Sequence, residues 1–237
     1  MSDRYSLLRL FKAVCLVLTL GVSMSAYGFD GASWKEEVLL HDGQKLIAER
    51  SQTYGGYSEP ASRERQLVEE VWEFAIPGTK ERVIWKSDWG RNNQDNLSLL
   101  VFDFLGNTPY IATSTGLCHA YNKWKRPNPP YIFFKFDGKV WQQISLNEFP
   151  AQFTNVNVAV GRPDRENRTG TLSSARIKEE NRHLEAYRRT ILRTPLTPRE
   201  ATIVGCPEPT GPDGLPIEGG FKAPFPITPP NSTEDKK

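Results

Sequence analysis

Residues 97–115 read LSLLVFDFLGNTPYIATST, and this stretch decides the fold class. Residues 97–104 are almost continuously apolar, which is typical of a strand that is buried on both faces, so we predict a central strand there. Gly106 and Asn107 favour a turn, after which Tyr110–Thr115 returns as a second strand. The stretch therefore predicts a β-hairpin in the core of a mainly β protein.

Three more predicted hairpins surround this one, each with a glycine in its turn. They pair Trp34–Leu40 with Lys45–Ser51, Leu67–Ile76 with Arg82–Lys86, and Tyr131–Phe136 with Val140–Ile144. The apolar-alternating run Val156–Val160 predicts a ninth strand. This pattern favours an antiparallel meander of eight or nine strands that forms a sandwich or a barrel-like sheet. A propeller is the alternative, because the turns recur regularly, although the hairpins share little beyond turn chemistry.

Residues 171–193 predict one amphipathic helix of about five turns that docks on the sheet. Thr171 or Ser173 can cap its start and Pro195 ends it. One face carries the apolar side chains of Ile177, Leu184, Tyr187 and Ile191. The alternative is a helix that binds a membrane surface or a partner, because the opposite face carries more basic than acidic residues.

The N-terminal residues 1–28 have the three parts of a secretory signal peptide: a basic start, the apolar run 13–22, and the small residues Ala26-Tyr27-Gly28. The alternative is that residues 13–22 stay as an inner-membrane anchor, but this run is too short to span a bilayer as a helix. We therefore divide the chain into a signal peptide (1–28), a β domain (29–165), a helix and docking segment (166–206) and a Pro-rich flexible tail (207–237).

Removal of the signal peptide changes the charge balance. The chain has 30 basic and 28 acidic residues, and the first 28 residues hold three of the basic ones and one acidic one, so 27 of each remain. A neutral mature chain lacks the overall field that attracts nucleic acids, so we predict no nucleic-acid partner.

The mature chain keeps Cys118 and Cys206, and in an oxidising compartment this pair predicts a disulfide. The alternative is a nucleophilic Cys118 with His119 as its base. Neighbours on a strand point to opposite faces, which disfavours that pair.

The sequence lacks the common catalytic motifs, including those of serine hydrolases, zinc proteases and nucleotide-binding loops. The histidines, at 41, 119 and 183, lack metal-ligand spacing. The acidic pairs Glu36-Glu37 and Glu69-Glu70 are interpreted as solvated strand faces. We predict no catalytic residue, metal or cofactor, and we keep open a hydrolase whose site is built from distant loops.

Residues 121–128, YNKWKRPN, resemble a recognition loop most closely. Aromatic faces beside amide and cationic groups suit sugar or peptide binding, so the candidate ligand-binding residues are Tyr121, Lys123, Trp124 and Arg126. The alternative is that these rings close one end of the β core.

The stretches Trp34–Gly43, Asn122–Lys139 and Arg193–Leu196 resemble a family of uncharacterised exported proteins of Gram-negative proteobacteria, which has no assigned activity. The resemblance covers most of the mature chain as far as Cys206 and implies a periplasmic location. Together, these observations predict a non-enzymatic binding or interaction protein of the cell envelope, whose partner is an envelope protein or glycan. A hydrolase that acts on envelope material is the alternative.

Fractionation of cells that express the full chain is expected to recover a mature form beginning near Phe29 from the periplasm, because residues 1–28 have the pattern of a cleavable signal. Mass determination of the N-terminus measures this. Full-length protein in the inner membrane would instead show that residues 13–22 anchor the chain.

Overall fold

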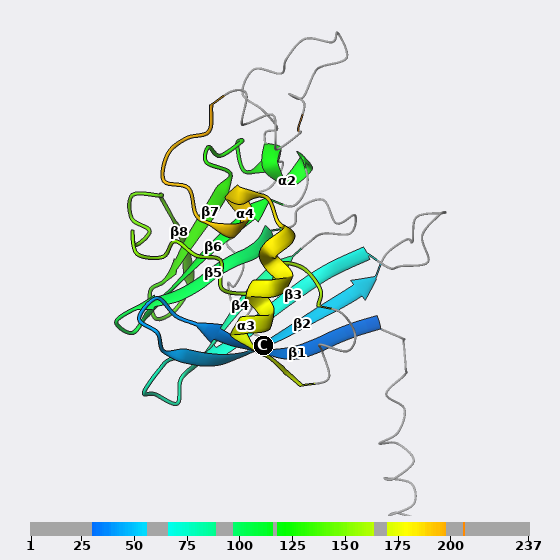
Figure 1. Ribbon diagram of the computed structural model, residues 1–237, viewed down its shortest axis with the longest axis vertical. Coiled ribbons are helices and arrows are strands. Elements are labelled where there is room, and N and C mark those ends of the chain that lie inside the picture. Colours follow the sequence, from blue (N-terminus) through cyan, green and yellow to red (C-terminus); the bar gives the residue numbers. More distant parts are fainter. Residues whose placement is uncertain are drawn as a thin grey trace, which may run out of the picture.

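A computed structural model describes residues 30–55, 66–88, 97–115, 118–163, 170–197 and 206, and they form two β-sheets that pack face to face (Figure 1). The first sheet has the order β4-β3-β2-β1-β9, and the second has the order β5-β6-β7-β8. The strands are β1 (Asp30–Leu39), β2 (Lys45–Gly55), β3 (Gln66–Ala75), β4 (Arg82–Asp88), β5 (Leu97–Leu105), β6 (Thr108–Thr115), β7 (Tyr131–Phe136), β8 (Trp141–Ile144) and β9 (Thr171–Leu172). The predicted signal peptide and Pro-rich tail lie outside the described residues.

The predicted antiparallel hairpins and the mainly β fold class are confirmed. Each sheet is a meander of consecutive antiparallel strands, apart from β9, which pairs in parallel with β1 at Lys35 and Glu36. In the described part of the chain the two sheets do not close on each other. The fold is therefore a sandwich, and neither the barrel-like sheet nor the propeller is found.

Aromatic side chains from both inner faces fill the space between the sheets. Phe74 of the first sheet contacts Phe102 of the second at 4.2 Å between ring centroids, and both side chains are fully buried. The indole of Trp141 is also buried and donates a hydrogen bond of 2.8 Å to the carbonyl oxygen of Ile84, across the sandwich. Burial of this aromatic area removes apolar surface from water and therefore favours folding.

Strand β5 is buried on both faces, as predicted, but it is an edge strand and not a central one. Its outer edge is covered by Asn157. The amide group of this side chain accepts a hydrogen bond from the N–H of Phe102 and donates one to its carbonyl oxygen, at 3.0 and 2.8 Å. One side chain thus satisfies backbone groups that a neighbouring strand would otherwise pair with.

The prediction of a ninth strand at Val156–Val160 is wrong, and the ninth strand is β9. The segment makes single backbone hydrogen bonds, from the N–H of Asn157 to the carbonyl oxygen of Leu100 and from the N–H of Val156 to that of Arg189, and side chains hold the rest of its backbone. Asn181 donates to the carbonyl oxygen of Val158 at 2.7 Å and accepts from the N–H of Val160 at 3.2 Å. The adjacent residues Val158 and Ala159 are both buried, and they pack in two different apolar clusters.

The single long helix predicted over residues 171–193 is not what the structure has. The chain forms α3 (Ser174–Glu180), a 3-10 turn (Asn181–His183) and α4 (Ala186–Arg189). Ser173 caps α3, and Leu184 and Glu185 are extended. Tertiary contacts compete with the helix, because the Tyr131 hydroxyl donates to the carbonyl oxygen of Tyr187 at 2.6 Å. Burial raises the pKa of this Tyr131 hydroxyl to about 12.

The predicted disulfide is present and joins Cys118 to Cys206, with 5.1 Å between their Cα atoms. Cys118 begins α2 (Cys118–Lys123), a short helix between β6 and β7, where the sequence predicted no helix or strand. Within the described residues, no helix is long and apolar enough to cross a membrane.

Candidate functional site

The outer face of the first sheet carries a shallow, open hollow of about 440 Å³. It extends over β1, β2 and β3 to the start of β9. The side chains and backbone that line it belong to Ser33, Trp34, Lys35, Glu49, Arg50, Ser51, Val71, Glu73, Gly170 and Thr171. Strand alternation puts every second residue of β1 and β2 on this face, so the hollow lies on the solvent-facing side of the sheet.

The hollow combines hydroxyl groups with charges of both signs. Ser33 and Ser51 are paired in register on β1 and β2, and both are exposed. The Lys35 ammonium lies 3.6 Å from the Glu49 carboxylate. Arg82 of β4 contacts Glu49 and Glu73 from the border. This set of donors and acceptors can bind a neutral, hydroxyl-bearing or amide-bearing ligand.

The floor of the hollow is fixed from below by a buried ionic cluster. The side chain of Arg50 passes to the inner face, where its guanidinium lies 3.2 Å from the carboxylate of Glu36 and 2.8 Å from that of Glu70. All three side chains are almost fully buried. Because loss of one partner leaves a charge buried without compensation, such a cluster tightly restrains the strands that carry it.

The Glu36 carboxylate is saturated with hydrogen-bond donors. Besides Arg50, it accepts from the indole N–H of Trp34 at 2.6 Å and from the backbone N–H of Ala159 at 2.9 Å. Burial nevertheless raises the pKa of Glu36 above its usual value. The Ala159 carbonyl oxygen accepts from Arg50, so both sides of this residue's backbone are bound by the cluster.

The interpretation of both acidic pairs as solvated faces is therefore wrong for Glu36 and Glu70. Their neighbours Glu37 and Glu69 do face outward, as strand alternation requires. The same alternation was visible in the sequence, since Glu36 is in phase with Trp34 and Val38. The alternation did not reveal which group pairs with the Glu36 carboxylate, because Arg50 lies on another strand.

The predicted loop residues are placed at one end of the sandwich. Tyr121 is buried under the Arg126 guanidinium, which lies 4.9 Å from the ring centroid. Arg126 also donates to the Cys206 carbonyl oxygen at 2.9 Å, beside the disulfide. Trp124 is half-buried and contacts Phe134 edge to face, with 6.2 Å between ring centroids, and Lys123 is half-exposed. The structure thus brings these residues together, away from the hollow.

A second polar pair joins the β1–β2 turn to β5, on the face of β5 that points away from the first sheet. The imidazole Nδ1 of His41 lies 2.8 Å from the Asp103 carboxylate, which also accepts the His41 backbone N–H at 2.8 Å. Burial raises the pKa of Asp103. The other face of His41 contacts the Phe153 ring edge to face, at 4.9 Å between centroids.

Comparison of the chain with protein-family models, curated proteins and solved structures finds no match. The site is therefore interpreted from its geometry, and the resemblance to an exported family stays a prediction. Among the described residues, no three His, Cys, Asp or Glu side chains are grouped to hold a metal ion.

Replacement of Trp124 by Ala is expected to lower the free energy of unfolding by about 2–3 kcal/mol, less than for a fully buried Trp, because the ring packs on Phe134 and the core. Denaturant titration measures this. Lys125→Ala is the control, since its side chain is exposed and should matter by less than about 0.5 kcal/mol. A Trp124→Ala protein as stable as this control would identify the ring as a surface recognition group.

The buried Glu36 should make stability depend on pH. Its pKa in the folded chain lies above 4.5, so the folded state binds this proton more tightly than the unfolded chain does. Raising the pH from below 4.5 through the folded pKa should therefore lower the free energy of unfolding, and Glu36→Gln should remove this decrease. Urea titrations across this pH range measure the effect.

Glu37 is the matched control for that experiment, because hydrogen bonding from Lys45 lowers its pKa. The contribution of Glu37 to the free energy of unfolding is present above its usual pKa and is lost as the pH falls. Glu37→Gln should therefore change the pH dependence of stability in the direction opposite to that of Glu36→Gln. Identical pH profiles for the two variants would contradict the assignment.

Proposed function

We propose that this protein is a non-enzymatic binding module of the bacterial cell envelope, exported to the periplasm, and that the hollow on its first sheet receives the ligand. The observation that carries the proposal is the hollow of about 440 Å³ on a sheet whose strands are fixed from below by Arg50. A surface that is held rigid before binding loses little entropy when a ligand arrives.

The lining favours a glycan as the ligand class. Ser33 and Ser51 supply hydroxyl groups, and Lys35, Glu49 and Glu73 supply charges of both signs. A large charged ligand of one sign would meet repulsion from part of this lining, whereas hydroxyl and amide groups pair with either sign. Among the materials of an envelope, peptidoglycan carries such groups at high density.

The disulfide supports the export part of the proposal. A bond between Cys118 and Cys206 is stable in an oxidising compartment and rare in the bacterial cytosol. Residues 1–28, with the pattern of a signal peptide, supply the route.

A hydrolase acting on envelope material is the second candidate, and the pair His41–Asp103 favours it. A carboxylate that holds Nδ1 of a histidine at 2.8 Å orients the ring and leaves Nε2 to act as a general base. The side chain of His41 keeps 26% of its surface exposed, so solvent reaches it.

The decisive experiment is co-sedimentation of the mature protein with purified peptidoglycan sacculi. Ser51→Arg places a long side chain in the hollow and is expected to weaken binding at least about tenfold, a loss of about 1.4 kcal/mol. Gln143→Arg is the control, because it adds the same charge at an exposed position of β8 on the other sheet.

Equal binding by the two variants would overturn the hollow as the site. Release of soluble fragments from the sacculi by the wild-type protein, abolished in His41→Gln, would favour the hydrolase. Retention of binding without release would support the binding module.

A further inference from the structure

Two segments that are far apart in the sequence meet at the end of the sandwich that carries α2 and α4 (Figure 1). The side chain of Asn128 donates to the Leu196 carbonyl oxygen at 2.9 Å and accepts the Leu196 N–H at 2.7 Å. The Tyr131 hydroxyl donates to the carbonyl oxygen of Tyr187 at the same end. Residues 118–130 and 184–197 therefore form one continuous surface.

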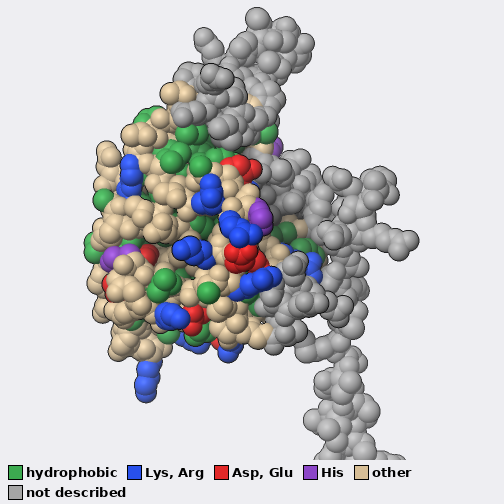
Figure 2. All heavy atoms as spheres, viewed as in Figure 1, with side chains coloured by type: hydrophobic (Ala, Val, Ile, Leu, Met, Phe, Trp, Pro, Cys, Tyr) green, Lys and Arg blue, Asp and Glu red, His purple; other side chains and the backbone are tan. Residues whose placement is uncertain are grey.

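This surface is basic. We call it the basic end, and define it by Lys123, Lys125, Arg126, Arg188, Arg189 and Arg193. Segment 118–130 has no acidic residue, and segment 184–197 has only Glu185. On the face that carries α3, by contrast, basic and acidic side chains are interspersed, as Figure 2 shows. The basic end is thus a local excess of positive charge on a chain whose total charge is only +2.

Contacts among the described residues leave positive charge at this end. Arg193 donates to the backbone carbonyl oxygens of Leu146 and Phe149, which are neutral acceptors and leave its charge in place. The carboxylate of Glu185 lies 3.8 Å from the guanidinium of Arg188 and can compensate the charge of only one cation.

The basic end also presents cations to solvent. Lys125 and Arg189 are exposed, and no ion pair to another described residue is found for either. The rings of Trp124 and Tyr187, which precede Lys125 by one residue and Arg189 by two in the sequence, are half-buried. Exposed cations next to aromatic rings with a polar edge are the combination found where proteins rest on the headgroups of a membrane.

We propose that the basic end docks peripherally on an anionic membrane surface, with Lys125 and Arg189 close to the lipid phosphates. Each Lys or Arg near such a surface strengthens binding about fivefold, so a few exposed cations suffice for weak, reversible association. A nucleic acid is the less favoured partner, because the chain as a whole lacks the positive field that nucleic-acid binders use. This inference is independent of the hollow, which lies on the outer face of the first sheet.

Sedimentation of the mature protein with vesicles tests the proposal. Vesicles of equal parts phosphatidylglycerol and phosphatidylcholine are compared with vesicles of phosphatidylcholine alone. The wild-type protein is expected to bind the anionic vesicles at least about tenfold more tightly, and raised salt should weaken this binding. The double variant Lys125→Glu/Arg189→Glu should lose the preference.

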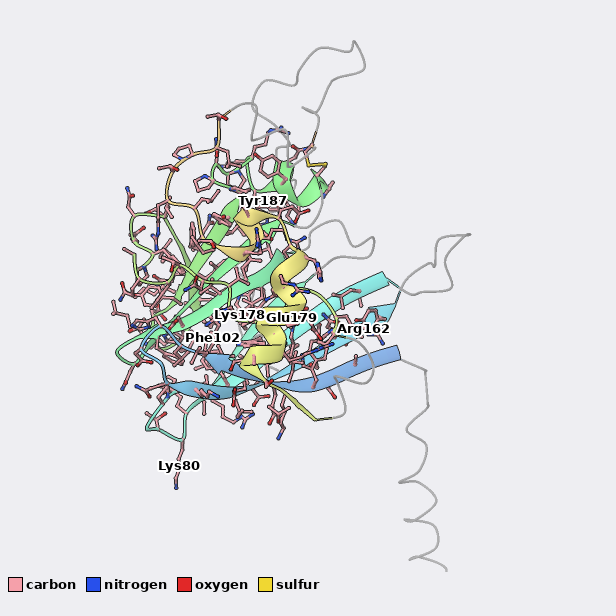
Figure 3. All side chains as sticks on the ribbon, viewed as in Figure 1. Lys80, Phe102, Arg162, Lys178, Glu179 and Tyr187 are labelled. Carbon is pink, nitrogen blue, oxygen red and sulfur yellow. A yellow bond between two sulfur atoms is a disulfide. The ribbon has the colours of Figure 1, made fainter. Side chains whose placement is uncertain are left out.

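A matched control carries the same change of charge at the opposite end. Lys80→Glu/Lys139→Glu alters two exposed lysines in the β3–β4 and β7–β8 turns, and Figure 3 shows Lys80 projecting far from Tyr187. Both double variants change the net charge by the same amount, so they are compared at the same salt concentration. This control should bind anionic vesicles within about twofold of the wild-type protein. Circular dichroism establishes that both double variants are folded.

Equal losses in the two double variants would show that net charge alone causes the binding, and would overturn the proposal. Equal binding of the wild-type protein to both kinds of vesicle would overturn it as well. The Lys125→Glu/Arg189→Glu protein is also tested for binding to peptidoglycan sacculi. If the basic end and the hollow are distinct sites, this variant should lose vesicle binding and keep sacculus binding.

Discussion

The guanidinium of Arg50, buried between Glu36 and Glu70, is the interaction on which the surrounding structure depends. It joins β2 to both of its neighbours through side chains, in addition to the backbone ladder. It also holds the carbonyl oxygen of Ala159, while Glu36 accepts the N–H of the same residue. A charged group buried in this position needs charged and polar partners, and these contacts hold the segment around Ala159 against the first sheet.

Side chains that bind backbone groups are a general device in this molecule. Asn157 covers the edge of β5, Asn181 holds the backbone of Val158 and Val160, and Asn128 pairs with Leu196. Arg193 donates to carbonyl oxygens of the loop that follows β8. These side chains thereby satisfy backbone groups of irregular segments that cover the sandwich and have no neighbouring strand to pair with.

The two surfaces assigned to binding differ in origin. The hollow lies on regular strands that the core fixes from behind, so its shape is set by the sheet. The basic end is built from loops that the Cys118–Cys206 disulfide and the Asn128–Leu196 contact bring together. Rigid strands favour a site that recognises shape, whereas clustered cations favour a site that recognises charge.

The eight antiparallel strands could be predicted from local signals, namely their apolar runs and glycine turns, and the disulfide could be predicted because the predicted mature chain has two cysteines. The hollow, the edge position of β5 and the breaks in the segment predicted as one long helix depend on contacts between distant residues. The tertiary structure also decided that Glu36 and Glu70 are buried, since Arg50 reaches them only after three strands align. Local periodicity reports which residues share a face, whereas the identity of the group opposite that face depends on contacts between residues distant in the chain.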